Sequence, residues 1–232
     1  MSIMLISVHL PKTAGTSFGA VLTQQYGDRL LRDYGDYPIN TPVIDRHRAA
    51  LAHAVACAAE PDRFADVPCI HGHFLPIKYL PLVDQLDEVR FVTWLRHPVD
   101  RVISHYEYWK RKYQPKTAPA LQRQMVEEAW TLERFCLGPE MRNLYCQFLW
   151  GFPLDYFSFV GVTEYYNEEV RIFGRQFLDD EVDAQRLNTA DTEPRHREPI
   201  EQGLRDRIAE EHGADMALYL RALDAYNKRK AT

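Results

Sequence analysis

Short apolar runs alternate with stretches of helical spacing along this chain, and this alternation constrains the fold more than any other feature. The apolar runs predict buried strands over residues 3–10, 67–71, 89–95 and 157–162. Helical spacing predicts helices over residues 16–26, 45–60, from 98 onward, 165–177, 200–212 and 214–229. Strands that alternate with helices form βαβ units and a mostly parallel sheet. We therefore expect an α/β fold, a P-loop-like three-layer α/β/α domain around a central, mostly parallel sheet of four to five strands.

Length and composition favour a single domain over residues 1–232. The chain has 232 residues, of which 46% are hydrophobic and 26% charged, so it can bury a core and has no disordered composition. The segment from about residue 114 to 151 has helical character and interrupts the order of strands and helices. It is interpreted as a helical insertion over a site.

Charge, cysteine content and hydropathy exclude several classes of protein. Lys plus Arg is 28 and Asp plus Glu is 33, and a net charge of −5 argues against broad nucleic-acid binding. The four cysteines form no C-x-x-C pair, so no zinc ribbon is expected, and the chain is too large and too poor in cysteine for a disulfide scaffold. The apolar run over residues 3–10 is too short for a membrane span and lacks the basic start of a signal peptide. A soluble, cytoplasmic protein with no membrane span is the expectation.

The loop after the first predicted strand has the composition of an anion site. It reads Pro11-Lys12-Thr13-Ala14-Gly15-Thr16-Ser17 and leads into a helix. Backbone N–H groups of such a loop bind anionic oxygens, Lys12 adds a full charge, and Thr16 and Ser17 add hydroxyl donors. The pattern is not a Walker A loop, because the lysine precedes the glycine. The plainer interpretation is that Thr16 only caps the helix.

A second candidate anion site follows the third predicted strand. Arg96 stands at the strand end, and Ser104 lies eight residues further on, about two turns into the next helix. Ser104 can therefore face back toward Arg96, and a guanidinium and a hydroxyl can clamp a phosphate. The alternative is a solvated helix face on which Asp100 forms an ion pair with Arg96 or Arg101.

Two histidines follow the second predicted strand, in the sequence His71-Gly72-His73. Residues two apart in an extended chain face the same side, so both imidazoles can point into one site. A histidine with a pKa near neutrality suits the role of general base for a hydroxyl group. Two alternatives stay open: a histidine that only holds the loop, or half of a metal site. No convincing set of carboxylates accompanies the histidines, so no metal site is expected.

The motifs PKTAGTS and LRHPVDRVISHY, in this order and each after a strand, resemble sulfotransferases that use 3′-phosphoadenosine 5′-phosphosulfate (PAPS). In that family the first loop holds the 5′-phosphosulfate, and the Arg and Ser eight residues apart hold the 3′-phosphate. The resemblance covers about residues 3–225. It implies that residues 11–17, Arg96 and Ser104 bind PAPS, with adenosine 3′,5′-bisphosphate (PAP) as product, and that Lys12 acts in catalysis. It implies no required metal.

The H-G-H sequence resembles carbohydrate sulfotransferases of the heparan sulfate 2-O and 6-O branch, in which a histidine after this strand deprotonates the acceptor. The resemblance implies His73 as the general base, with His71 as second choice or helper. It also implies a hydroxyl acceptor, expected to be a glycan or a glycan-containing small molecule. A chain without a membrane anchor and stem suits a soluble, bacterial-type member of this branch.

Weaker parts of the resemblance concern the second half of the chain. Family members often carry an Arg where this chain has Gln147 or Phe148. Glu164 is the last residue of a V-G-x-T-E sequence at the end of the fourth predicted strand. We expect it to cap the helix that follows. Arg195 and Arg197 lie in a polar loop and are candidates for closing over the adenosine.

Two further questions stay open at this level. A nucleotide-dependent kinase-like enzyme on the same fold and a non-catalytic nucleotide-binding module are the alternatives to sulfuryl transfer. Aromatic residues are abundant in the middle of the chain, where they can stack on sugar rings or simply pack helices together. They are Tyr108, Trp109, Tyr113, Trp130, Tyr145, Trp150 and Tyr156.

Overall fold

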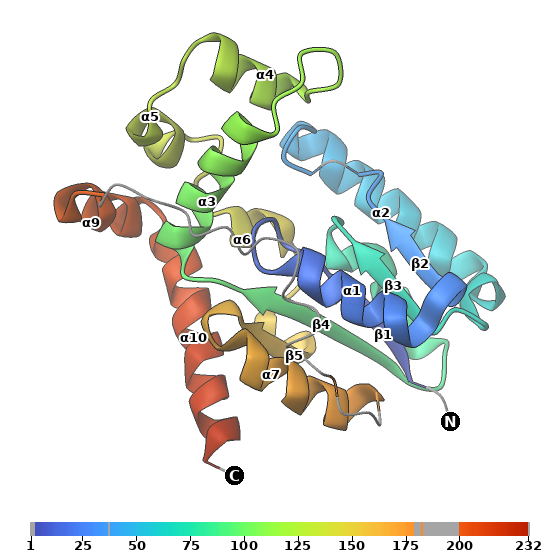
Figure 1. The fold of residues 1–232 in the computed structure, drawn as a ribbon. Coiled ribbons are helices and arrows are strands. Elements are labelled where there is room, and N and C mark those ends of the chain that lie inside the picture. The colour runs from blue at the N-terminus through green and yellow to red at the C-terminus, as the bar shows by residue number, and fades with distance from the viewer. Residues whose placement is uncertain (1–2, 37, 179–181, 183–199, 232) are drawn as a thin grey trace.

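The fold is a parallel five-stranded sheet between two layers of helices, as the sequence predicts (Figure 1). The computed structural model describes residues 3–36, 38–178, 182 and 200–231. The sheet order is β2-β3-β1-β4-β5, and every neighbouring pair is parallel. The strands are β1 (Met4–Val8), β2 (Leu30–Asp33), β3 (Cys69–Gly72), β4 (Val89–Leu95) and β5 (Phe157–Val162).

Strand β2 is the one that the sequence pattern does not predict. It has four residues, its second half is Arg32 and Asp33, and it pairs only with β3 at the edge of the sheet. A short edge strand needs no long apolar run, because one of its sides has no neighbouring strand. Two of the expected strands also shift: the first is shorter, and the second begins and ends later.

Alternating side chains of the strands build two separate cores. On β1, Leu5 packs in the cluster that includes Phe18 and Val170, whereas Ile6 packs in the cluster that includes Tyr145 and Tyr219. The first face is covered by α1 (Gly15–Tyr26) and α7 (Tyr166–Phe173). The second is covered by α2 (Val43–Ala59), the 3₁₀ segment η3 (Pro76–Asp84), α6 (Leu144–Phe148) and α10 (Gly213–Lys230).

The middle of the chain forms a third hydrophobic cluster beyond the sheet. Its members include Trp109, Phe135 and Ile208. It joins α3 (Pro98–Arg111), α4 (Ala120–Glu127), α5 (Leu132–Leu137) and α9 (Gln202–Glu211). In Figure 1, α3 leads away from the end of β4 toward α4 and α5. The helical stretch expected near residues 114–151 therefore consists of the short helices α4, α5 and α6.

The helix expected over residues 165–177 is also divided. A 3₁₀ turn at Thr163–Tyr165 precedes α7, and a π-helical turn at Gly174–Leu178 follows it. The two helices expected at the end of the chain, α9 and α10, lie within a residue or two of their predicted bounds.

The carboxyl ends of β1 and β4 meet at the centre of the sheet. Val8 is in register with Gly72 on one side and with Thr93 on the other. The chain continues from β1 into α1 on one face, and from β4 through α3 to α6 on the opposite face. In open α/β sheets, ligands bind where the connections of adjacent strands diverge in this way.

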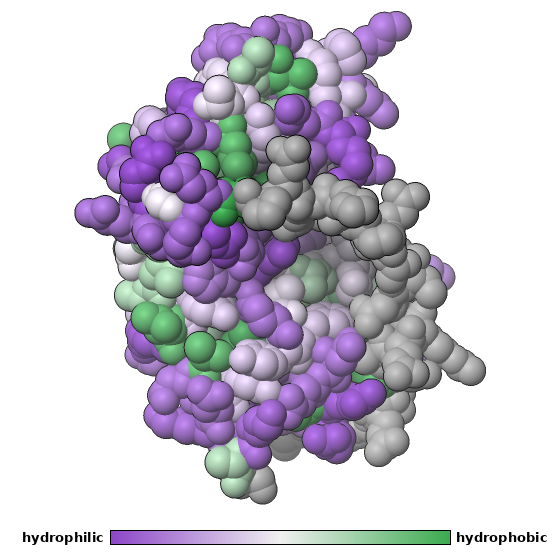
Figure 2. All heavy atoms as spheres, turned by 60° about the vertical axis from the view of Figure 1, so that its left-hand side comes forward, coloured by the Kyte–Doolittle hydropathy of each residue, from purple (hydrophilic) through white to green (hydrophobic). Residues whose placement is uncertain are grey.

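The surface gives two further observations. No described helix has both the length and the apolar character that a membrane-spanning helix needs. Figure 2 shows the side of the molecule that lies to the left in Figure 1, where hydrophilic residues predominate and hydrophobic ones form small groups between them.

Candidate active site

A cavity of about 870 Å³ lies at the carboxyl ends of the strands. Its volume lies within the range of roughly 300–1,000 Å³ that small-molecule sites occupy. The segments that follow β1, β2, β3, β4 and β5 all contribute to its wall, together with α3 and α6. The residues predicted from the sequence that line it are Pro11, Lys12, Ala14, Gly15, Thr16, Ser17, His73, Arg96 and Ser104.

Four residues predicted for the site do not line this cavity. Thr13 and His71 are each about 1% exposed and lie behind its wall. Arg195 and Arg197 lie outside the residues that the structure describes. The cavity also includes Tyr34, which sequence reasoning missed because Tyr34 directly follows the unrecognised strand β2.

The loop between β1 and α1 has an unusual backbone. Lys12 and Ala14 have φ angles of 68° and 63°, in the left-handed region that costs a non-glycine residue roughly 1–2 kcal/mol. The buried Thr13 hydroxyl donates to the Leu10 carbonyl at 2.8 Å and holds the turn. Left-handed residues within a turn direct successive N–H groups inward and form anion-binding concavities. The strain is thus consistent with a loop shaped for an anion.

Helix α1 begins at Gly15, and its first turn forms part of the cavity wall. A side chain at Gly15 would overlap the imidazole of His9, so only glycine allows this approach. Ala14 is the N-cap and no side chain caps the helix, so the interpretation of Thr16 as only a cap is wrong. The first N–H groups of a helix have no partner within the helix and favour anions.

Lys12 supplies the positive charge of this part of the cavity. Its Nζ atom lies 4.0 Å from the centre of the Tyr108 ring, which comes from α3. A lysine over the face of an aromatic ring is attracted by the negative charge of the ring's π-electrons. Lys12 therefore bridges the first loop and the helix that carries Ser104.

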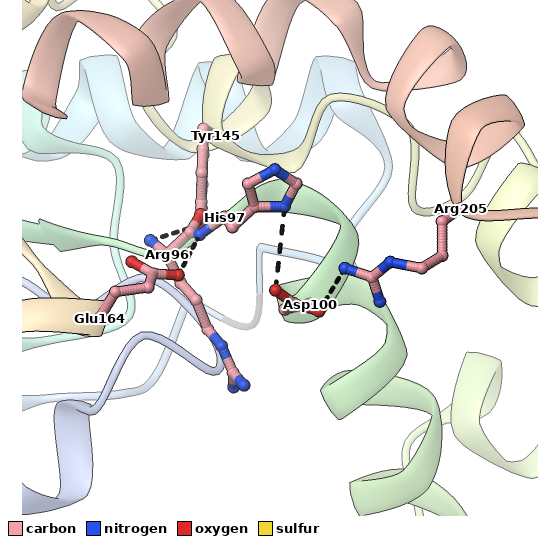
Figure 3. A network of polar contacts seen from close by, with 6 residues as sticks. All are labelled: Arg96, His97, Asp100, Tyr145, Glu164 and Arg205. Carbon is pink, nitrogen blue, oxygen red and sulfur yellow. Dashed lines mark hydrogen bonds and ion pairs between the residues drawn. The ribbon is translucent and has the colours of Figure 1, made fainter. Parts of the chain in front are cut away.

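Arg96 and Ser104 line the same cavity from the end of β4 and from α3. The Tyr145 hydroxyl donates to the Arg96 carbonyl at 2.7 Å and accepts the Arg96 N–H at 3.0 Å. The first turn of α3 is held by Glu164, whose carboxylate accepts the His97 N–H at 2.8 Å. Figure 3 shows that the Arg96 side chain extends away from Tyr145, while its backbone is fixed by these contacts.

The ion pair considered from the sequence is different in the structure. Asp100 pairs with Arg205 of α9 at 2.9 Å and lies 4.0 Å from the His97 ring, and it forms no ion pair with Arg96 or Arg101 (Figure 3). Arg101 is fully buried, 5.8 Å from the Tyr145 ring centre, so the solvated-face interpretation is wrong for this position. No side-chain hydrogen bond caps the turn and the helix that follow β5, so the expected cap by Glu164 is wrong there. The Glu164 carboxylate instead accepts the N–H of His97 at the start of α3.

Three imidazole rings lie next to one another near the loop after β1, with His9 between His71 and His73. The His9 and His71 rings are stacked at 5.2 Å, and the His9 and His73 rings lie 4.1 Å apart. The Ser7 hydroxyl contacts His71 Nδ1 at 2.8 Å, and the Tyr34 hydroxyl contacts His9 Nδ1 at 3.0 Å.

The prediction that His71 and His73 point into the same site is wrong, because β3 ends at Gly72. Beyond that residue the alternation of sides no longer applies, and His71 faces the interior.

The hydrogen bond of His73 fixes its tautomer. His73 Nδ1 contacts the carbonyl oxygen of His9. A carbonyl only accepts, so Nδ1 carries the proton and Nε2 has the lone pair. Burial lowers the pKa of His73 below its ordinary value of 6.5, and the ring is therefore neutral at pH 7. A neutral imidazole with an unprotonated Nε2 in a cavity is suited to accept a proton.

The other histidines near the cavity are also held in the neutral form. Burial lowers the pKa of His71 to about 3, with smaller effects of His73 and Arg32. Burial is also the main reason why the pKa values of His9 and His105 lie well below 6.5. Among these groups, His9, His73 and His105 line the cavity.

The mid-chain aromatic residues divide between the cavity and helix packing. Tyr108 and Trp109 line the cavity, and Trp109 also packs in the third hydrophobic cluster. Trp130 and Tyr145 are buried in hydrophobic clusters, and the other three lie elsewhere. Trp150 stacks on His47, the Tyr113 hydroxyl donates to Glu127, and Tyr156 packs edge to face against Phe152.

Comparison with known proteins gives no relative from which a function can be transferred. The sequence matches no protein-family model, and no curated protein matches it significantly. Among the residues that the structure describes, no group of three or more His, Cys, Asp or Glu side chains is placed to hold a metal ion. Function therefore has to be inferred from the side chains at the cavity.

Proposed function

We propose that the chain transfers a sulfuryl group from PAPS to the hydroxyl group of an acceptor. The observation that carries this proposal is the meeting of three predicted groups in one cavity: the Lys12 loop, the pair of Arg96 and Ser104, and His73. They come from three strand ends that are widely separated in sequence. Two candidate anion-binding positions and a neutral histidine from such distant segments would not be expected to line one cavity by coincidence.

The side chains fit the donor because PAPS carries negative groups at both ends of its ribose. The Lys12 loop and the first turn of α1 are suited to the 5′-phosphosulfate. Arg96 and Ser104 are suited to the 3′-phosphate, since a guanidinium forms strong charge-assisted hydrogen bonds to phosphate oxygens. Asp100 and Glu164 also line the cavity, but each is held by another partner, Arg205 and the His97 N–H.

Sulfuryl transfer requires that donor and acceptor be held in line and that the charge developing on the leaving phosphate be stabilised. Sulfuryl transfer resembles phosphoryl transfer, in which a loosely bonded group passes in line between two oxygens. His73 Nε2 accepts the proton of the acceptor hydroxyl as the new bond from oxygen to sulfur forms. Lys12 and the loop N–H groups stabilise the negative charge on the phosphate as its bond to the sulfur breaks. The products are the sulfated acceptor and PAP.

The test is transfer of labelled sulfate. The protein is incubated with PAPS that carries a sulfur isotope and with a set of hydroxyl acceptors, and the products are analysed by mass spectrometry. We expect a labelled sulfate ester, formed at the same rate with EDTA present. A parallel reaction with ATP and Mg²⁺ tests the kinase-like alternative. Phosphorylation of the same acceptors, without sulfation, would contradict the proposal.

A further inference from the structure

Lys12 combines a fixed backbone with a flexible side chain. Its φ angle of 68° lies in the left-handed region, and the buried Thr13 hydroxyl holds the turn by donating to the Leu10 carbonyl at 2.8 Å. A lysine carries its charge at the end of a flexible four-carbon stem with high rotamer entropy. The turn therefore fixes the Cα atom of Lys12, and the position of its ammonium group depends on what the side chain contacts.

The ring of Tyr108 is such a contact. Lys12 Nζ lies 4.0 Å from the ring centre, well within the roughly 6 Å over which the face of an aromatic ring attracts a cation. The guanidinium carbon of Arg111, on the same helix as Tyr108, lies 5.9 Å from the same ring centre. Lys12 is the closer of these two cations, although it comes from a distant segment of the chain.

Tyr108 lies on a well-anchored part of α3. The neighbouring Trp109 is buried, and its ring centre lies 4.5 Å from that of His105 and 5.6 Å from that of Phe135. The Gln122 side chain donates to the Trp109 carbonyl at 2.9 Å. These contacts fix the backbone of Tyr108 relative to the cavity, so its ring is a stable support for a flexible side chain.

The position of the ammonium group matters for both ends of the cavity. Ser104 and Tyr108 are four residues apart on α3, so they are neighbours on one face of the helix, and both line the cavity. Burial is the largest cause of the lowered pKa values of His9 and His105, and the charge of Lys12 is a smaller one. The Lys12 charge thus acts on the histidine side of the cavity as well as on the loop side.

A ring face can hold this cation without neutralising it. Asp100 and Glu164 also line the cavity, but Asp100 pairs with Arg205 at 2.9 Å and Glu164 accepts the His97 N–H at 2.8 Å. A carboxylate beside Lys12 would offset the positive charge that an anionic donor requires. A ring carries no net charge and attracts the ammonium group through its π-electrons.

We propose that Tyr108 is a positioning residue, whose ring holds the ammonium group of Lys12 where the 5′-phosphosulfate of the donor binds. The proposal rests on the proposed function and adds to it a residue that acts through another side chain. Without the ring, the Lys12 side chain regains rotamer freedom, and ordering it again opposes donor binding and transfer. The proposal does not depend on the identity of the acceptor.

Two substitutions of Tyr108 separate the ring from the hydroxyl group. Tyr108→Leu removes the ring face, and we expect kcat/KM for PAPS to fall by about fivefold or more. The expected loss is moderate because Tyr108 is 37% exposed. Tyr108→Phe keeps the ring face and should recover most of the loss. Wild-type kcat/KM in Tyr108→Leu, or equal losses in the two variants, would overturn the proposal.

A double-mutant cycle shows whether Tyr108 acts through Lys12. In a Lys12→Ala background the ring has no ammonium group to hold, so adding Tyr108→Leu should change kcat/KM by less than about twofold. Tyr108 also lines the cavity, where its side chain could contact a ligand directly. In that case the losses of the two substitutions would multiply in full, and the proposal would be wrong.

Lys110→Ala is the matched control. Lys110 Nζ lies 5.2 Å from the ring centre of Tyr106, which gives a contact of the same kind on the same helix, and Lys110 is exposed and lies outside the cavity lining. We expect kcat/KM to stay within about twofold of the wild-type value. A loss as large as that of Tyr108→Leu would show that the surface charge of α3 sets the activity, contrary to the proposal.

A chemical measurement without donor separates this proposal from the proposed function. Limited acetylation with acetic anhydride is followed by mass spectrometry, and the extent of modification at Lys12 is divided by that at Lys110. The ring favours the protonated ammonium group and covers it, so Tyr108→Leu should raise this ratio by about fivefold and Tyr108→Phe much less. If the wild type transfers no sulfate from PAPS, the proposed function fails, and a raised ratio would still support the positioning of Lys12 by Tyr108. An unchanged ratio would overturn the proposal even if the wild type transfers sulfate.

Discussion

The hydroxyl of Tyr145 is bonded to both backbone groups of Arg96: it donates to the carbonyl at 2.7 Å and accepts the N–H at 3.0 Å. Tyr145 comes from the first turn of α6, and Arg96 directly follows β4. The backbone of Arg96 is therefore fixed before any ligand arrives. Preorganisation of this kind reduces the entropy that binding has to overcome.

Tyr145→Phe should weaken binding of PAP by about tenfold, because the Arg96 backbone loses both bonds. The free energy of unfolding should also fall by about 1–3 kcal/mol, since buried backbone groups lose their partner. Calorimetric titration and denaturant unfolding measure the two effects.

The matched control is Tyr106→Phe. The Tyr106 hydroxyl donates to the Trp130 carbonyl at 2.9 Å, and this bond does not involve Arg96. We expect a loss of stability without a change in PAP affinity. If both variants bind PAP like the wild type, Tyr145 does not position Arg96.

His73→Asn should lower kcat by about two to four orders of magnitude and leave PAP binding nearly unchanged. His73 is the histidine whose Nε2 has the lone pair at the cavity, and it is not among the groups assigned to the donor. Steady-state kinetics with a turned-over acceptor and calorimetry with PAP separate the two effects.

His71→Asn is the control for this variant. His71 is buried behind the cavity wall, so its replacement should lower stability and change kcat much less. Lys12→Ala should lower both kcat and donor affinity, because Lys12 lines the cavity on the loop that we propose to hold the 5′-phosphosulfate. A His73→Asn variant with normal turnover would move the base to His9 or His105, which also line the cavity.

The pH dependence of kcat follows from the state of His73. Burial lowers the pKa of His73 below 6.5, so the neutral, proton-accepting form persists at pH 7. Protonation at lower pH removes the base, so kcat should fall on the acid side with a midpoint below pH 6.5. His71→Asn should keep this profile, since burial lowers the pKa of His71 to about 3. A midpoint at or above pH 7 would exclude His73 as the titrating base.

The strained loop makes a prediction about stability. Ala14 has a φ of 63°, whereas Ala20 lies exposed within α1. Glycine at position 14 relieves the left-handed strain, and glycine at position 20 weakens a helix by about 1 kcal/mol. Ala14→Gly should therefore be more stable than Ala20→Gly by about 2–3 kcal/mol in denaturant unfolding. Equal losses of stability in the two variants would show that the loop is not strained.

The sequence predicts the parts of the site that depend on short-range order. Apolar runs and helical spacing place Lys12 and Arg96 after buried strands, and a parallel sheet brings such ends together. The register of the strands confirms that the ends of β1, β3 and β4 meet. Local patterns suffice here because each motif directly follows its strand.

What the sequence does not predict depends on contacts between distant segments. Tyr34 enters the cavity because the short edge strand β2 ends beside it, and four residues give too little pattern to recognise. The contact of Tyr145 with Arg96 joins residues that are 49 positions apart. The burial of Arg101 depends likewise on packing of α3 against later helices, which no local spacing encodes.

The central claim is that one donor bridges the Lys12 loop and the pair of Arg96 and Ser104, and paired nucleotide titrations test it most directly. PAP and AMP differ by the 3′-phosphate, so their affinity ratio measures the Arg96 end alone. In the wild type, PAP should bind about 10–100-fold more tightly than AMP. In Arg96→Ala this ratio should approach one while the AMP affinity is kept, and Arg90→Ala, at an exposed position on the same strand, should retain the wild-type ratio. Equal binding of PAP and AMP by the wild type, or an unchanged ratio in Arg96→Ala, would contradict the account.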